Sequence, residues 1–118
     1  MGTFVTKLRF ANLTDPARFV DLEALVDSGA TYSWISRQTL QQIGVRPMSK
    51  MPFRTITGVI EREMAGVLVS EDGKTAADNV VVAEPGDMEV IGAFTLEALG
   101  VAADVVQRKL VPTIGMAL

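Results

Sequence analysis

Asp27 is the acidic residue whose sequence surroundings are least typical of a carboxylate. It follows the apolar residues 24–26 and precedes the small residues Ser28, Gly29 and Ala30. Moving a carboxylate out of water costs several kcal/mol unless hydrogen bonds or a shared proton compensate it. Asp27 therefore either opens a turn, accepting backbone N–H bonds from residue 29 or 30, or takes part in chemistry.

The chain has no cysteine and no histidine, and this narrows the chemistry open to it. Thiol nucleophiles, disulfides, thiolate metal sites and Ser-His or Cys-His catalysis are all excluded. Acid–base work would fall to the 14 acidic residues or, failing them, to lysine or tyrosine. Most of these acids have a simpler explanation, because they lie in expected turns, on solvent-facing strand positions, on a short helix or at a strand start: Asp15, Asp72, Asp87, Glu61, Glu63, Glu71, Glu97 and Asp104.

Composition indicates a globular protein with a substantial core. The 118 residues are 48% hydrophobic and suit a single domain over residues 1–118. A net charge of −3 with scattered basic residues argues against nucleic acid as a partner. No apolar run approaches the ~20 residues of a membrane helix, so we expect a cytoplasmic protein with no membrane partner. We expect no metal and no cofactor.

Hydrophobic alternation and turn signals predict a mainly β chain with two short helices. Ser36 is expected to cap the first helix, which ends near Gly44, and the second runs from residue 93 to Gly100. A loop is expected between Pro47 and Pro52, and a final hairpin over residues 104–111. The predicted strands are residues 3–10, 18–26, 32–35, 53–60, 61–70, 75–83 and 88–91.

The segment D-S-G-A-T resembles the active-site signature of the retroviral-type, or retropepsin-like, aspartic proteases, in their bacterial and cellular branch. Their second hallmark, two apolar residues and a glycine before a short helix, is matched by V-I-G at residues 90–92. The resemblance covers about residues 22–111. It implies a closed β-barrel of the acid-protease fold that forms half of a two-fold dimer. Where many retroviral members carry an ion pair, this chain has Ala93 and Thr31.

The resemblance also implies an activity, that of a homodimeric aspartic endopeptidase acting on extended peptide or protein substrates. Asp27 would be the catalytic residue of each subunit, in an active-site loop of Ser28, Gly29, Ala30 and Thr31. Two carboxylates sharing one proton are needed for this chemistry, and the chain has one such motif, so the second copy must come from a partner. A flap hairpin over residues 52–63 is expected, and the substrate-binding positions would be Ile56, Thr57 and Gly58 at its tip, with Met88 and Val90 as walls.

Three alternatives stay open at this stage. Met88 and Val90 can equally be core residues, because apolar residues at strand spacing usually are. The chain can be a catalytically weak or inactive dimerisation or peptide-binding module of the same fold. It can also be an unrelated small β domain with a chance motif. The C-terminal segment 113–118 is expected to serve as an interface strand.

Overall fold

The barrel of this chain is a seven-stranded sheet that closes on itself. The computed structural model describes residues 3–115. Two short helices pack on the barrel, α1 (Arg37–Gln42) and α2 (Ala93–Leu99), and a separate two-stranded sheet follows them, β8 (Val101–Asp104) with β9 (Lys109–Pro112). The barrel strands are β1 (Phe4–Ala11), β2 (Phe19–Val26), β3 (Trp34–Ser36), β4 (Ser49–Thr55), β5 (Gly58–Glu71), β6 (Lys74–Ala83) and β7 (Val90–Ile91).

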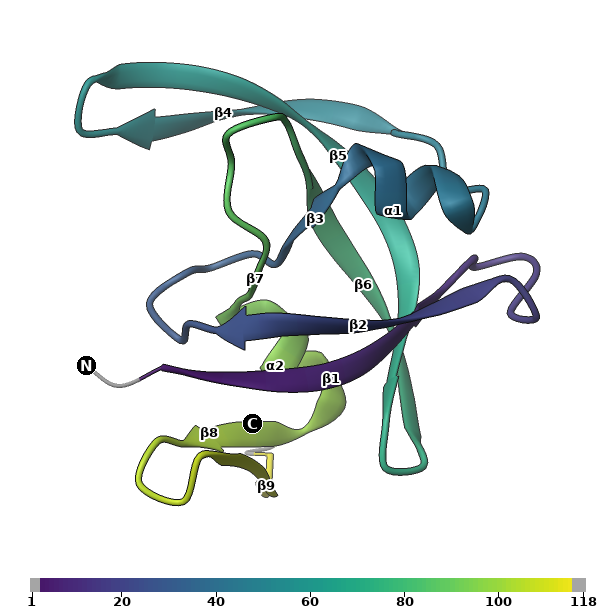
Figure 1. Cartoon of the computed structure of the whole chain (residues 1–118), viewed down its shortest axis with the longest axis vertical. Coiled ribbons are helices and arrows are strands. Elements are labelled where there is room, and N and C mark those ends of the chain that lie inside the picture. The colour runs from purple at the N-terminus through teal and green to yellow at the C-terminus, as the bar shows by residue number, and fades with distance from the viewer. Residues whose placement is uncertain (1–2, 116–118) are drawn as a thin grey trace.

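The strand order is β1-β2-β7-β3-β6-β5-β4, and a further pairing of β1 with β5 closes the barrel (Figure 1). Alternate residues of β1 point inward, so Phe4, Leu8 and Phe10 are buried. Most pairs are antiparallel, but β2 pairs with β7 and β3 with β6 in parallel. These two parallel pairs bring segments far apart in the sequence together at the centre of the sheet. The mainly β closed-barrel prediction is confirmed.

Both helices begin and end where the sequence predicts. The Ser36 side chain accepts a bond from the Thr39 N–H and caps α1. Gly100 ends α2 with φ at 68°, a left-handed conformation that glycine adopts without a steric penalty. Between residues 3 and 115, no helix is long and apolar enough to cross a bilayer.

Three element predictions were wrong in detail. The loop expected between Pro47 and Pro52 is largely strand, because β4 begins at residue 49 and includes Pro52. Proline is tolerated there because β4 is the outermost strand of the sheet. The segments 53–60 and 61–70 are not two strands, since the chain turns at residues 56–57 and β5 then continues for 14 residues. The last hairpin is longer than expected and takes in Val101 and Pro112.

Two acids expected to be simply solvated are paired instead. Glu63 on β5 accepts a bond from Arg37 at the start of α1. Asp87, in the loop between β6 and β7, forms an ion pair with Arg62. Turn composition and strand alternation do not reveal these pairs, because their partners lie 25 residues or more away in sequence. Both pairs attach the β4–β5 hairpin to the body of the barrel.

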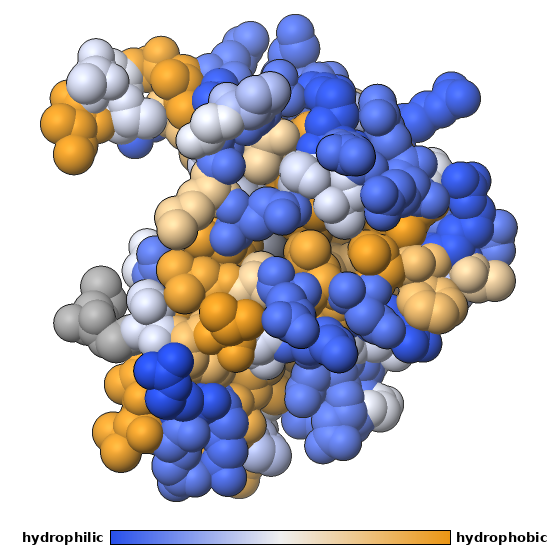
Figure 2. Space-filling model, in the orientation of Figure 1, coloured by the Kyte–Doolittle hydropathy of each residue, from blue (hydrophilic) through white to orange (hydrophobic). Residues whose placement is uncertain are grey.

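One side of the molecule gathers several chain reversals. In Figure 1 the β2–β3 loop, the tip of the β4–β5 hairpin and the β8–β9 turn all lie on the left. Apolar surface is visible along the same side in Figure 2. Ile56 in the hairpin turn and Val106 in the β8–β9 turn are highly exposed for apolar residues. The expected interface role of segment 113–118 falls in part outside the described residues.

Candidate active site

Asp27 stands at the end of β2, where the parallel strand β7 holds it in place. Leu25 and Val26 pair with Val90 and Ile91, and the Asp27 N–H then donates to the Ile91 carbonyl at 2.9 Å. Both hallmark segments of the sequence therefore meet through backbone hydrogen bonds. The Asp27 side chain is half-buried at the edge of the barrel.

The carboxylate of Asp27 also organises its own turn. Its Oδ1 accepts the Gly29 N–H at 2.9 Å, and the Ala30 N–H donates to the Asp27 carbonyl at 3.0 Å. The turn-opening role considered from the sequence is thus present. It does not compete with a chemical role, because the bond from Gly29 to Oδ1 fixes the orientation of the carboxylate.

Gly92 lets the second hallmark segment press against this loop. A Cβ at position 92 would lie 2.4 Å from the Tyr32 carbonyl oxygen and 2.8 Å from that of Ala30. The first turn of α2 then donates to the loop, from Ala93 to Ala30 at 2.7 Å and from Phe94 to Thr31 at 2.9 Å. Ala93 and Thr31, which the sequence showed to lack an ion pair, thus each take part in a backbone bond between the two segments.

A buried polar chain runs behind the loop. The Gly92 N–H donates to Ser33 Oγ at 2.9 Å, Ser33 bonds to Thr95, and the Thr95 hydroxyl donates to Asp78 Oδ2. Ser33 and Thr95 are fully buried. Because the Thr95 hydroxyl donates its one proton to Asp78, Ser33 is the donor in the bond to Thr95, so every donor has an acceptor.

Asp78 ends this chain on β6, and its role was missed from the sequence. Burial of the side chain raises its pKa, while the hydrogen bonds from Thr95 and from the Asn79 N–H act in the opposite direction. Its neighbours Ala77 and Asn79 are exposed, so strand alternation places Asp78 on the inward face with Ala76 and Val80. A carboxylate on that face of the strand was the signal available in the sequence.

Aromatic side chains connect the loop to the β4–β5 hairpin. Phe53 of β4 contacts Tyr32 edge-on, with ring centroids 6.0 Å apart, and Trp34 at 5.5 Å. Tyr32 in turn contacts Phe94 of α2 at 5.2 Å. A cavity of about 340 Å³ lies between loop and hairpin, lined by Ala30, Thr31, Tyr32, Trp34, Met51, Pro52, Phe53 and Arg54.

The remaining predicted site residues fall into two places. Ile56 and Thr57 form the hairpin turn, and Gly58 follows with φ at 143°, so the tip lies where the sequence predicts it. Met88 is exposed, whereas Val90 is buried in the sheet. Both line a shallow hollow beside Trp34. The structure thus brings Met88 and Val90 together and leaves the hairpin tip projecting away from the barrel (Figure 1).

Comparison with known proteins decides the family. The sequence profile of the family described as Aspartyl protease matches residues 16–99, which include both hallmark segments. This chain belongs to the family of aspartyl proteases that the profile describes. A chance motif in an unrelated β domain is therefore ruled out. A comparison with curated protein sequences gives no significant match.

Three solved structures have the same fold as this retropepsin-like chain. An EIAV protease, solved with the inhibitor HBY-793, is 19% identical with a TM-score of 0.63, covering 81% of this chain and 86% of its own. The simian foamy virus (mac) protease is 21% identical with a TM-score of 0.53, and the match covers 78% of this chain and 92% of that protease. A retropepsin-like aspartic protease from Rickettsia conorii is 21% identical with a TM-score of 0.51, and the match covers 88% of this chain and 89% of that protease.

Proposed function

We propose that this chain is an aspartic endopeptidase that works as a homodimer, with Asp27 of each subunit in one catalytic pair. One carboxylate, ionised, removes a proton from water as the water attacks the scissile carbonyl. The other, protonated, donates to the carbonyl oxygen. Two carboxyl groups about 3 Å apart cannot both ionise, so the pair keeps one proton over its working range.

The position of Asp27 is the observation that carries this proposal. The side chain is half-buried and oriented by the Gly29 N–H. Three backbone hydrogen bonds tie its loop to β7 and α2, and Gly92 packs closely against the same loop. Preorganisation of this kind is what a catalytic carboxylate needs. The loop also borders a cavity under the β4–β5 hairpin, which supports peptide binding next to the acid.

A two-fold dimer follows from the chemistry. The sequence contains one D-S-G segment, and a symmetric interface brings identical residues together at its axis. The loop shares its side of the molecule with the apolar turn residues Ile56 and Val106, which supports burial of that side against a second copy.

The other predicted residues have roles within this proposal. Ser28, exposed beside Asp27, would bond across the dimer to the partner's loop. Gly29, Ala30 and Thr31 would line the bound peptide, with Gly29 allowing its close approach. The β4–β5 hairpin would act as a flap that closes over the peptide with Ile56, Thr57 and Gly58 at its tip. Met88 and Val90 would contact a substrate side chain.

Cleavage of a denatured protein mixture between pH 4 and 7 tests the proposal. We expect the wild type to cleave it, with a rate that falls above neutrality, and Asp27→Asn or a pepstatin-like inhibitor to abolish cleavage. Asp21→Asn, at an exposed site on β2, is the control. Ser28→Ala should weaken the dimer without unfolding the chain. The cytoplasmic location expected from the sequence belongs to the same proposal, and cell fractionation tests it.

An inactive binding module would give a different result. Wild type and Asp27→Asn would then dimerise equally, and neither would cleave the mixture. Activity that rises steadily to pH 9 would contradict the shared-proton mechanism, since a pair that has lost its last proton cannot donate to the carbonyl oxygen.

A further inference from the structure

Arg62 and Asp87 join the β4–β5 hairpin to the loop between β6 and β7. Arg62 lies on β5 within the hairpin, and its Nε and Nη2 donate to Asp87 Oδ2 and Oδ1 at 2.7 and 3.0 Å. Two parallel bonds of this kind fix the direction of both groups as well as their separation. The loop cannot turn relative to the hairpin without breaking both of them.

The Arg62–Asp87 pair is partly withdrawn from water. The exposed fractions of the two side chains are 19% and 17%. Arg62 lowers the pKa of Asp87 through these bonds and so favours the ionised carboxylate. The chain also contains a matched pair, Arg9 and Asp21 on β1 and β2, with the same forked geometry but exposed fractions of 47% and 42%. Exposed pairs contribute little to stability, so Arg9–Asp21 is a natural control.

Asp87 also holds the shape of its own loop. Its Oδ2 accepts the Glu84 N–H at 2.8 Å, and its own N–H donates to the Glu84 carbonyl at 2.9 Å. On the other side of Met88, the Glu89 carboxylate accepts the Ser36 N–H at 2.8 Å. Met88 therefore stands between two anchored residues.

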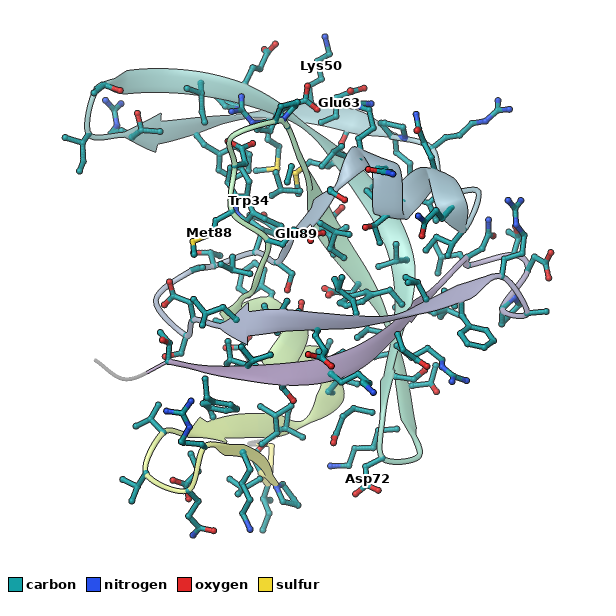
Figure 3. All side chains as sticks on the ribbon, in the orientation of Figure 1. Trp34, Lys50, Glu63, Asp72, Met88 and Glu89 are labelled. Carbon is teal, nitrogen blue, oxygen red and sulfur yellow. The ribbon has the colours of Figure 1, made fainter. Side chains whose placement is uncertain are left out.

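The Met88 side chain is free of such anchors and faces outward. It is 68% exposed, and in Figure 3 it points to the left, the side on which the β2–β3 loop lies. Together with Trp34, Val90 and the loop residues Gly86 and Asp87, it lines the hollow of about 340 Å³. A thioether and an indole offer an apolar wall and suit an unbranched or branched aliphatic side chain.

We infer that Arg62 and Asp87 are positioning residues that hold Met88 at a fixed place relative to the hairpin, and that they thereby select an aliphatic substrate side chain for the hollow beside Trp34. This inference rests on the proposed peptidase activity. Arg62 acts through Asp87, which borders the hollow and holds the adjoining Met88 in place. The selectivity arises because a wall held in one place makes full contact only with a side chain large enough to reach it.

Specificity is the first readout. Two peptides that differ at one residue next to the scissile bond are compared, the residue whose side chain enters the hollow. One peptide carries leucine at this residue and is cleaved by the wild type, and the other carries alanine. We expect the ratio of the two kcat/KM values to fall about tenfold in Asp87→Asn and in Arg62→Gln, and no further in the double variant, because the two residues act as one unit. Asp21→Asn should leave the ratio unchanged. A wild-type ratio in Asp87→Asn would overturn the inference.

The second readout does not depend on catalysis. With ¹³C-methyl-labelled methionine, the Met88 signal is assigned by its loss in Met88→Leu. We expect this signal to shift and sharpen in Asp87→Asn and Arg62→Gln, but not in Asp21→Asn, as Met88 becomes mobile. Arg62→Lys keeps the positive charge but cannot form two parallel bonds to Asp87, so the Met88 signal should change to an intermediate extent. This variant replaces the other two in the experiment if they fold poorly.

Together the two readouts separate this inference from the proposed function. An inactive wild type whose Met88 signal responds as expected refutes the peptidase and supports the positioning of Met88 by the pair. An unchanged Met88 signal in both variants refutes the positioning, whatever the activity. A changed signal with an unchanged leucine-to-alanine ratio refutes the selectivity.

Discussion

Replacing Gly92 by alanine tests how closely the two hallmark segments must approach. The added methyl group would lie 2.4 Å from the Tyr32 carbonyl oxygen and 2.8 Å from that of Ala30. Both are backbone atoms, which cannot rotate away as the end of a side chain can. Ordinary contact begins near 3.4 Å, so the active-site loop or α2 must move by about 1 Å.

The size of the effect follows from that displacement. Overpacking a close-packed site costs about 1–3 kcal/mol of unfolding free energy. A shift of about 1 Å in catalytic geometry lowers kcat/KM about 100-fold. We therefore expect Gly92→Ala to lower both the unfolding free energy and kcat/KM. Urea denaturation measures the unfolding free energy, and peptide cleavage measures kcat/KM. The activity loss should be larger than the stability loss explains, because most molecules stay folded.

Gly66→Ala on β5 is the matched control. Its Cβ would meet Leu13 Cδ1 at 3.0 Å and Met48 Sδ at 3.4 Å, both at the ends of flexible side chains. That variant should lose little stability and no activity. If Gly92→Ala behaves like Gly66→Ala in both assays, the loop tolerates displacement and the argument from its close contacts is wrong.

Three further substitutions test the surroundings of the site. Ser33→Ala leaves the Gly92 N–H without its acceptor and should cost about 1–3 kcal/mol in urea denaturation. Ser70→Ala, at a half-buried hydroxyl whose bond to Thr75 is exposed, should cost under about 0.5 kcal/mol. Equal losses would contradict the buried network. Asp78 has a raised pKa, so the folded state holds its proton more tightly and stability falls as pH rises through that pKa. The unfolding free energy of Asp78→Asn should therefore rise relative to that of the wild type as the pH is raised from 3 to 7. A difference in unfolding free energy between the two proteins that does not change with pH would contradict this. Phe53→Ala loses the aromatic contacts with Tyr32 and Trp34, worth about 0.5–1.5 kcal/mol each, and should raise KM about fivefold. An unchanged KM would mean that the hairpin does not take part in substrate binding.

Local signals account for much of the fold that the sequence predicts. The E-D-G-K turn between β5 and β6 is one example, because Asp72 and Gly73 both take positive φ there, at 50° and 81°. Ser36 and Gly100 fix helix ends through bonds within a few residues. Asp27 was found because its motif and the second hallmark are each contiguous in sequence.

Features that depend on packing between distant segments could not be predicted. Pro52 was read as a loop residue because its place in an outermost strand is a property of the whole sheet. The fork between Arg62 and Asp87 requires β5 and the β6–β7 loop to lie side by side. Asp78 meets Thr95 only once α2 packs on the barrel. Each of these depends on tertiary contacts rather than on residue type or spacing.

Mixing of subunits tests the central claim, that two chains share one catalytic pair. Wild type and Asp27→Asn are unfolded together, refolded and assayed at constant wild-type concentration. If each active unit needs two Asp27 side chains, activity per wild-type chain falls to about one half in an equal mixture and to about one tenth at a ninefold excess of the variant. Activity per wild-type chain that stays constant at every ratio would mean that one chain is sufficient, and would contradict the account.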